Sequence, residues 1–316
     1  MRLRYLAVFS VLSLATVASA SDPQLLKLVM PDAKVVSGVD IDKVMLTPFG
    51  RFFLNQLPAP DSGFQEFVTA TGFDPRRDIH EILMASPGDP GKKSGLLLVR
   101  GDFDTARIMG LAKAMGQVAQ NYNGVDILAG GGGKTKAISQ ALAFLSNSIA
   151  IAGDVDSVRG AIDRRTSGSG VSDAGLSSKV ASTSVTQDAW VVSIVPISSL
   201  AGAVPNKNVS GALQGDLIKG IQQSSGGVRF GSMIEISGEL TARTNQDATS
   251  LADVVKFFMS MAQMSSPTSG NSEISSLLHN LTVNTEANAV KVSISIPEDQ
   301  VEMLIKMGAH HAAPRI

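Results

Sequence analysis

A near-repeat of ten residues constrains this chain more than any other feature. Residues 32–41 read DAKVVSGVDI and residues 188–197 read DAWVVSIVPI, with seven of ten positions identical at an offset of 188 − 32 = 156 residues. Both stretches are rich in β-branched residues and predict strands. A strand that recurs at such a distance predicts that a larger unit is present twice.

The segments that follow the two copies support this prediction, because helices and strands come in the same order. After the first copy we expect helices at 47–58 and 61–72, strands at 81–86 and 95–101, a helix from 104, strands at 124–130, 136–144 and 146–153, and a helix from 154. After the second copy we expect one long strand or a tight hairpin at 231–244, a helix at about 246–264, two strands within 281–296 and a helix from 297. Short turns favour antiparallel pairing, and single apolar helix stripes favour helices on one sheet face. The predicted fold class is α+β, with two duplicated units of antiparallel sheet covered by helices on one face.

The composition of the connecting segments sets the boundaries of these units. The expected division is a signal peptide at 1–20, a first unit at 21–165, a Ser/Gly-rich linker at 166–187, a second unit at 188–308 and a disordered tail at 309–316. Within the linker, a short helix at 176–182 is an alternative. The polar loops 205–211 and 265–272 are expected to be mobile.

The N-terminal segment has the three parts of an export signal. Arg2 and Arg4 precede an apolar run at 5–17, and the small residues of 18–20 form a cleavage site. The alternative, a membrane anchor, needs roughly 20 apolar residues, which this run does not reach. We therefore expect cleavage after Ala20 and a periplasmic or extracellular mature chain.

Composition excludes several classes of function. The chain has no cysteine, which rules out disulfides, thiol catalysis and cysteine-based metal sites. The formal net charge is −1 and only 17% of residues are charged, and no basic run exists that could neutralise several phosphates. We therefore expect no nucleic-acid binding. No segment after residue 20 is apolar over a length that spans a bilayer, so no transmembrane segment is expected in the mature chain.

The glycine run in AGGGGKTKA, residues 129–137, resembles a nucleotide-binding loop at first sight. That loop requires G-x-x-x-x-G-K-[ST] between a strand and a helix. The position of its first glycine is occupied by Leu128, and the following segment continues as a strand. The run therefore predicts a hairpin turn. The shorter GSG at 168–170 lacks the remaining glycine of a dinucleotide motif and is assigned to the linker.

The densest group of ionisable residues is GFDPRRDIHE at 72–81. A carboxylate–histidine acid/base site is one interpretation. The favoured interpretation is a turn that begins at Asp74 and whose arginines pair with nearby acids, because His80 and Glu81 are adjacent on a strand and face opposite sides. The spacing of the four histidines, which include His279, matches no metal motif, and no G-x-S-x-G sequence occurs. No catalytic, cofactor-binding or metal-binding residue is assigned.

The helix at 246–264 carries a wide apolar stripe that includes Phe257, Phe258 and Met261. Its regular helical period favours a core role. The alternative is a groove for a lipid or another apolar ligand, or a surface for a partner protein.

Three stretches carry a resemblance to a known family. The turn GFDPRRD, the strand DAWVVS and the strand–helix AIAGDVDSVRGAIDRR resemble exported bacterial proteins grouped in a domain-of-unknown-function family. The resemblance covers most of the mature chain. It implies export and duplication, and it implies no catalytic residue.

Two functional hypotheses follow from the sequence. The first is an exported, non-enzymatic envelope protein that binds a hydrophobic small molecule or an envelope protein, or acts as a scaffold, without a cofactor. The alternative is an envelope hydrolase with a dispersed Ser/His/Asp site, in which His80 or His279 is the base.

Overall fold

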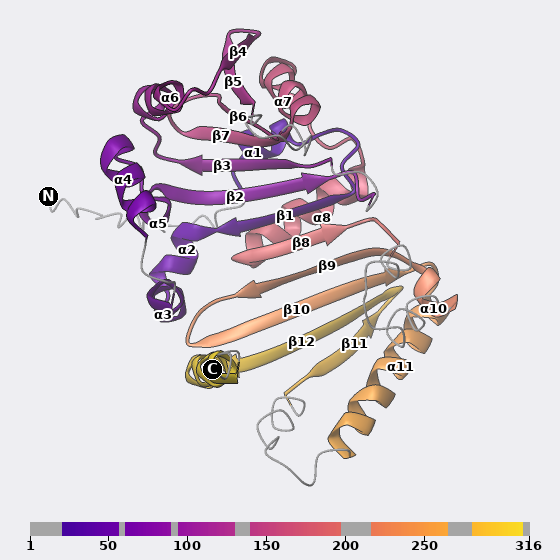
Figure 1. Ribbon diagram of the computed structural model, residues 1–316. Coiled ribbons are helices and arrows are strands. Elements are labelled where there is room, and N and C mark those ends of the chain that lie inside the picture. The colour runs from indigo at the N-terminus through magenta and orange to yellow at the C-terminus, as the bar shows by residue number, and fades with distance from the viewer. Residues whose placement is uncertain are drawn as a thin grey trace, which may run out of the picture.

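The computed structural model describes residues 21–56, 61–89, 94–129, 140–196, 216–264 and 280–311. Within these residues twelve strands form one antiparallel sheet, in the order β11-β12-β10-β9-β8-β1-β2-β3-β7-β6-β5-β4. Figure 1 shows this sheet running without a break from β4 to β11. The mixed α and β composition and the antiparallel sheet agree with the expected class.

The elements follow one another in a simple order along the chain. The strands are β1 (Val35–Asp40), β2 (Ile79–Ser86), β3 (Leu96–Gly101), β4 (Ala119–Tyr122), β5 (Val125–Ala129), β6 (Gln140–Phe144), β7 (Ile149–Asp154), β8 (Ala189–Ser193), β9 (Ile221–Arg229), β10 (Met233–Ala242), β11 (Thr282–Glu286) and β12 (Ala289–Pro297). The helices described are α1 (Pro23–Leu28), α2 (Ile41–Leu46), α3 (Pro48–Gln56), α4 (Ser62–Thr71), α5 (Pro75–Asp78), α6 (Thr105–Ala114), α7 (Val155–Ser167), α8 (Ala174–Thr186), α10 (Asp216–Lys219), α11 (Asn245–Met264) and α13 (Glu298–His311). Asp104 and Asp154 cap α6 and α7, as their sequence positions predict.

The two similar decapeptides meet at the middle of the sheet. β1 pairs with β8 in antiparallel register, and Val36 lies opposite Val192. Both valines have no exposed surface. Beside them Gly38 lies opposite Trp190, and a Cβ atom on Gly38 would come within 2.6 Å of both the indole ring and Leu83. The glycine therefore makes the space that the Trp190 ring occupies.

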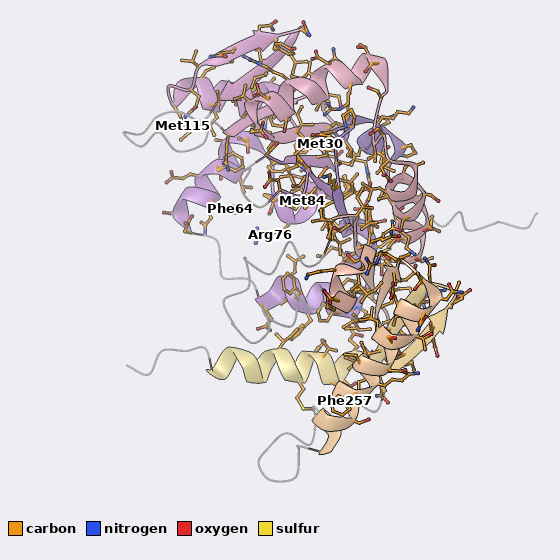
Figure 2. The ribbon with its side chains drawn as sticks, turned by 90° about the vertical axis from the view of Figure 1, so that its right-hand side faces the viewer. Met30, Phe64, Arg76, Met84, Met115 and Phe257 are labelled. Atoms are coloured by element: carbon orange, nitrogen blue, oxygen red, sulfur yellow. The ribbon has the colours of Figure 1, made fainter. Side chains whose placement is uncertain are left out.

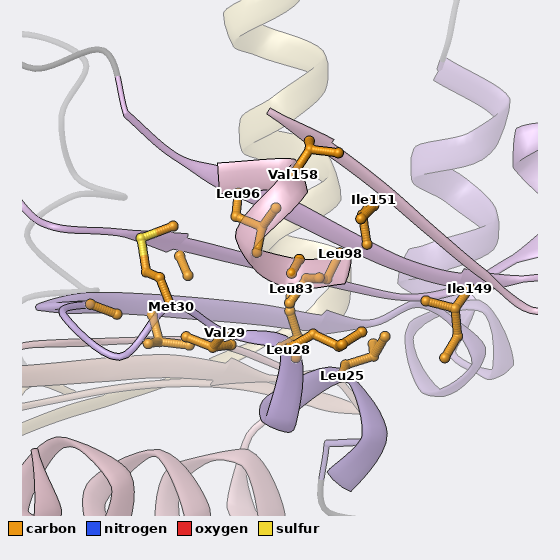
Figure 3. Close-up of a cluster of buried hydrophobic side chains, with 14 of the residues drawn as sticks. Leu25, Leu28, Val29, Met30, Leu83, Leu96, Leu98, Ile149, Ile151 and Val158 are labelled. Carbon is orange, nitrogen blue, oxygen red and sulfur yellow. The ribbon is translucent and has the colours of Figure 1, made fainter. Parts of the chain in front are cut away.

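One face of the sheet, called the Val36 face, carries the main core. Val36, Leu83, Leu98 and Ile151 share this face through their cross-strand pairing and are buried. The helices α1, α7 and α8 supply the side chains packed against them, including Leu25, Leu28, Val158, Ala161, Leu176 and Val180. Figure 3 shows Leu25, Leu28 and Val29 beside Leu83 and Leu98 of the sheet.

The second half of the sheet buries its opposite face, called the Met84 face. A single cross-strand row connects Met84 through Ser37, Val191, Gly226 and Gly238 to Val292 and Val283. Val292 and Val283 pack in a second core with Val290 and with Ala248, Leu251 and Ala252 of α11. The adjacent row on the Val36 face is polar in this half, where Ser237 pairs with Ser293. The core thus passes from one side of the sheet to the other between β8 and β10.

The expectation of helices on one face of each unit is wrong for the first half. Ile108 of α6 and Phe103 pack with Val99, Phe144 and Ala150, which lie on the Met84 face, whereas α7 covers the Val36 face. The prediction failed because β2 and β3 are apolar at successive positions, so that their sequence does not show which face a helix covers.

The expected linker 166–187 is largely helical. α7 continues to Ser167, and α8 spans most of the remainder with Leu176 and Val180 buried. Asp173 caps α8 by accepting a hydrogen bond from the Leu176 N–H. Ser177, Ser178, Ser182 and Thr186 of α8 are exposed, whereas Thr183 and Ser184 are buried, and this high content of serine and threonine gave the segment the composition of a linker. In the C-terminal segment, α13 extends to His311, three residues into the expected tail.

Several expectations concern residues outside the described ranges. These are the signal peptide, the glycine run at 130–133, the loops 205–211 and 265–272, and His279. β5 and β6, which flank the glycine run, do pair as antiparallel neighbours. No helix in the described part of the chain has the length and apolarity needed to cross a membrane.

Replacing Gly38 by Ala should lower the free energy of unfolding by about 1–3 kcal/mol, because the added methyl group overlaps Trp190 and Leu83. The matched control is Gly110→Ala in α6, where an added Cβ meets nothing within 4 Å. That change should be neutral or stabilising by about 0.5–1 kcal/mol. Urea unfolding followed by tryptophan fluorescence measures both, and equal effects of the two changes would contradict the packing described for Gly38.

Candidate functional site

Part of the Met84 face in the first half of the sheet is covered by no helix among the described residues. The row that contains Met84 continues through Leu97, Ala152 and Leu142 to Leu128. These side chains are apolar, and Met84 is 56% exposed. Figure 2 labels Met84 on the side of the molecule opposite α8. An antiparallel sheet with a solvated face normally carries polar side chains there, so this row needs another explanation.

A cavity of about 880 Å³ lies over this row. Its floor is formed by Val35, Met84, Leu97, Leu142 and Ala152, and the cavity is here called the sheet groove. Its volume falls within the roughly 300–1,000 Å³ of known small-molecule sites. The sheet groove is therefore the candidate binding site.

The sheet groove differs at its two ends. Towards α6, the next row of the same face consists of Ile82, Val99, Ala150 and Phe144. Ile108 of α6 packs on Val99, Ala150 and Phe144 of this row. At the opposite end, the lining residues Ser86, Ser94, Gln140 and Asp154 form a polar rim. The groove thus has an apolar inner end and a polar outer end.

The ionisable cluster at 72–81 forms the turn that its sequence predicts. Asp74 caps α5 by accepting from the Arg76 N–H, and its carboxylate pairs with the Arg76 guanidinium at 2.7 Å. Arg77 pairs with Asp78 at 2.6 Å. These hydrogen bonds to Arg76 and Arg77 hold the pKa values of Asp74 and Asp78 below their usual range. Arg76 also lies over the Phe64 ring, and both residues are labelled in Figure 2.

His80 occupies a β-bulge beside this turn. Ile79 and Glu81 pair with Gly101 and Arg100 of β3, which leaves His80 without an opposite residue. Its Nδ1 lies 2.8 Å from Asp42 and its Nε2 lies 3.1 Å from Asp102. The Asp42 hydrogen bond raises the pKa of His80; burial opposes this rise, and the Asp102 hydrogen bond adds to it.

The Glu81 carboxylate lies in a separate, buried environment. It is 5% exposed and accepts the Asp22 N–H on both oxygens at 3.2 Å. Burial raises the pKa of Glu81, while the Asp22 N–H and the Ser21 hydroxyl oppose this rise. Arg100 lies 3.6 Å from Glu81 and 3.4 Å from Asp42, and so it connects the two environments. His80 and Glu81 thus share a charge network through Arg100 and Asp42, but the partners of each are different.

The sequence did not predict the sheet groove. The sequence instead offered the apolar stripe of the helix at 246–264 as an alternative ligand groove. In the structure, Leu251 of this helix packs into the second core and Phe257 is exposed. The side chains of Phe258 and Met261 lie outside the described part. The signal that could have located the groove is the continuous apolar run of β2 and β3 in an antiparallel sheet, because such strands have two apolar faces.

Comparisons with known proteins add little. No protein family matches the chain, and no curated protein matches it. Among solved structures, the chain is similar to one described as crystal form I of TP0453, with 10% sequence identity and a TM-score of 0.49. The likeness covers 91% of this chain and 98% of the other. A similarity this distant carries no conclusion about function.

The His80 contacts predict a pH-dependent contribution to stability. The pKa of His80 is higher in the folded state than its unfolded value of about 6.5. The His80 contacts therefore contribute fully to the free energy of unfolding below about pH 6.5, and this contribution is lost as the pH rises through the folded-state pKa. His80→Gln should therefore lower the free energy of unfolding more at about pH 5.5 than at about pH 9, by on the order of 0.5–1 kcal/mol, since Asp42 and Asp102 are well exposed. Urea unfolding at both pH values measures this difference. A loss that is equal at the two pH values, or larger at pH 9, would show that the imidazolium is not stabilised here.

Proposed function

We propose that the protein is an exported, non-enzymatic binding protein of the cell envelope and that the sheet groove takes a small apolar ligand. The observation that carries this proposal is the apolar row from Met84, which is 56% exposed, to Leu128, with a cavity of about 880 Å³ over it. Burying apolar surface gains roughly 25 cal/mol per Å², so an apolar molecule that covers this row has a driving force for binding.

The packing of the first half indicates that the apolar row on the Met84 face serves a ligand and is not part of the hydrophobic core. The Val36 face of the same strands is already covered by α1, α7 and α8, and its residues Leu83 and Leu98 are fully buried. Apolar side chains on the other face therefore add nothing to that core. Exposed apolar patches of this kind mark binding sites for ligands or partners.

The hydrolase alternative with His80 as its base has less support. A general base must have a nitrogen free to accept a proton from a nucleophile. Both ring nitrogens of His80 face carboxylates, and its pKa is raised, so the imidazolium is the form that satisfies both contacts. In the described part of the chain, the hydrogen-bond partners of His80 are Asp42 and Asp102, and neither is a nucleophile of a Ser/His/Asp site.

We also infer that the two halves are copies of one unit. The strand order on either side of β1 and β8 supports this, because β1-β2-β3-β7-β6 and β8-β9-β10-β12-β11 follow the same sequence of connections. The decapeptide register supports it too. Val36 is opposite its sequence equivalent Val192, as a two-fold axis between the strands requires. Export through the signal at 1–20 belongs to the same proposal and has its support in the sequence pattern.

The proposed site is tested with decanol, an uncharged molecule with a single ten-carbon chain, titrated into the protein and followed through the methionine methyl signals in NMR. We expect a saturable shift of the Met84 signal, assigned by substitution. Met84→Glu should weaken binding by at least about tenfold, because it places a charge against the ligand chain.

The matched control is Met303→Glu in α13, where the methionine is 50% exposed against 56% for Met84. This control should leave the decanol affinity within about twofold of the parent value. No saturable binding of decanol to the parent protein, or an equal loss in both variants, would overturn the proposed site.

A further inference from the structure

We infer that the sheet groove selects a single-chain amphiphile with a cationic amine head, held with its tail towards α6 and its head at the polar rim. This inference rests on the proposed function, and it adds the orientation of the ligand and the charge of its head. The argument depends on three successive rows of the Met84 face and on the charges around the rim.

The three rows form a gradient of polarity along the groove. The inner row, with Val99 and Phe144, is apolar and partly covered by Ile108 of α6. The middle row, with Met84 and Leu97, is apolar and open. The outer row carries the polar side chains Ser86, Gln140 and Asp154 beside Val35, and there Gln140 pairs with Asp154. A molecule with a uniformly apolar surface would leave the outer row in contact with carbon, whereas an amphiphile places its polar end there.

The rim carries negative charge in the part of the chain that the structure describes. Among the described residues that line the sheet groove, the charged side chain is that of Asp154. A second cavity of about 500 Å³ continues around the strand ends and shares Ser94 and Asp154 with the groove. Its other charged lining residues are Asp32, Asp156 and Arg164, so that the described lining of the two cavities holds three carboxylates and one guanidinium.

Asp154 keeps its charge in this position. Burial raises its pKa, but hydrogen bonds from the Ser157 side chain, the backbone of Ser157 and Gly95, and Ser94 outweigh it and leave the pKa below the usual value. Arg164 donates from its Nε to the Leu28 carbonyl at 3.0 Å and keeps its charge, but the carboxylates of Asp32, Asp154 and Asp156 outnumber it among the described lining residues. A carboxylate or phosphate head at the rim would therefore meet like charge, and an ammonium head would meet opposite charge.

The experiment compares decylamine, decanol and decanoate, which share one chain length and differ in the charge of the head at pH 7. Affinities are measured by NMR on the full chain at low ionic strength, below the concentration at which the probes form micelles. We expect the affinity to decrease from decylamine to decanol to decanoate, with about a tenfold difference in affinity between decylamine and decanoate. Added salt should reduce this difference, because exposed charges are screened.

Variants assign the preference to the rim. Asp154→Asn preserves an N-cap residue and removes the charge, and it should reduce the amine-to-acid ratio severalfold. Because Asp154 makes several hydrogen bonds, the double change Asp32→Asn and Asp156→Asn provides a second test, since both residues are exposed. Asp299→Asn in α13 is the matched control and should leave the ratio unchanged.

The outcomes separate this inference from the proposed function. Binding of all three probes with equal affinity, or tighter binding of decanoate, would overturn the amine preference and leave an apolar site in place. A preference for the amine that persists in both rim variants would also overturn it, because the charge responsible would then lie elsewhere. Failure of all three probes to bind would overturn the proposed function itself.

Discussion

The pairing of β1 with β8 is the interaction on which the rest of the structure depends. It joins the five strands β1-β2-β3-β7-β6, with β5 and β4, to the five strands of the second half in a single sheet. At this seam Val36 and Val192 are fully buried, and the Trp190 ring fills the space left by Gly38. A strand left unpaired at this place would expose its backbone donors and acceptors as well as the valines.

The change of core face across the seam connects the fold to the proposed binding site. On the Met84 face, α11 packs on the second half, and in the described part of the first half α6 packs at one end. A sheet that buried the same face throughout would place all its apolar surface under helices. Here the sheet groove lies on the Met84 face over the strands of the first half.

The sequence predicts local structure well and the arrangement of faces poorly. Helix starts at Asp104 and Asp154 were predictable because an N-cap acts within three residues. β9 was not predicted, because its sequence IQQSSGGVR has few β-branched residues and derives its strand conformation from pairing with β8 and β10. The sheet groove depends on the register of six strands, and cross-strand register is not written in any local pattern. The turn at 72–81 was predictable because Asp74 and Arg76 interact within one short segment.

The segment that connects the two halves has a mechanical consequence. α8 packs Leu176 and Val180 into the core of the first half, and its Lys179 pairs with Glu239 of the second half at 2.7 Å. Hinged domains need a connection that few contacts cross, and here the connection is itself a helix laid over the seam. The two halves are therefore not expected to open by a hinge motion. A ligand that enters the proposed sheet groove must therefore do so by movement of side chains and surface segments, because the strands beneath it stay paired across the seam.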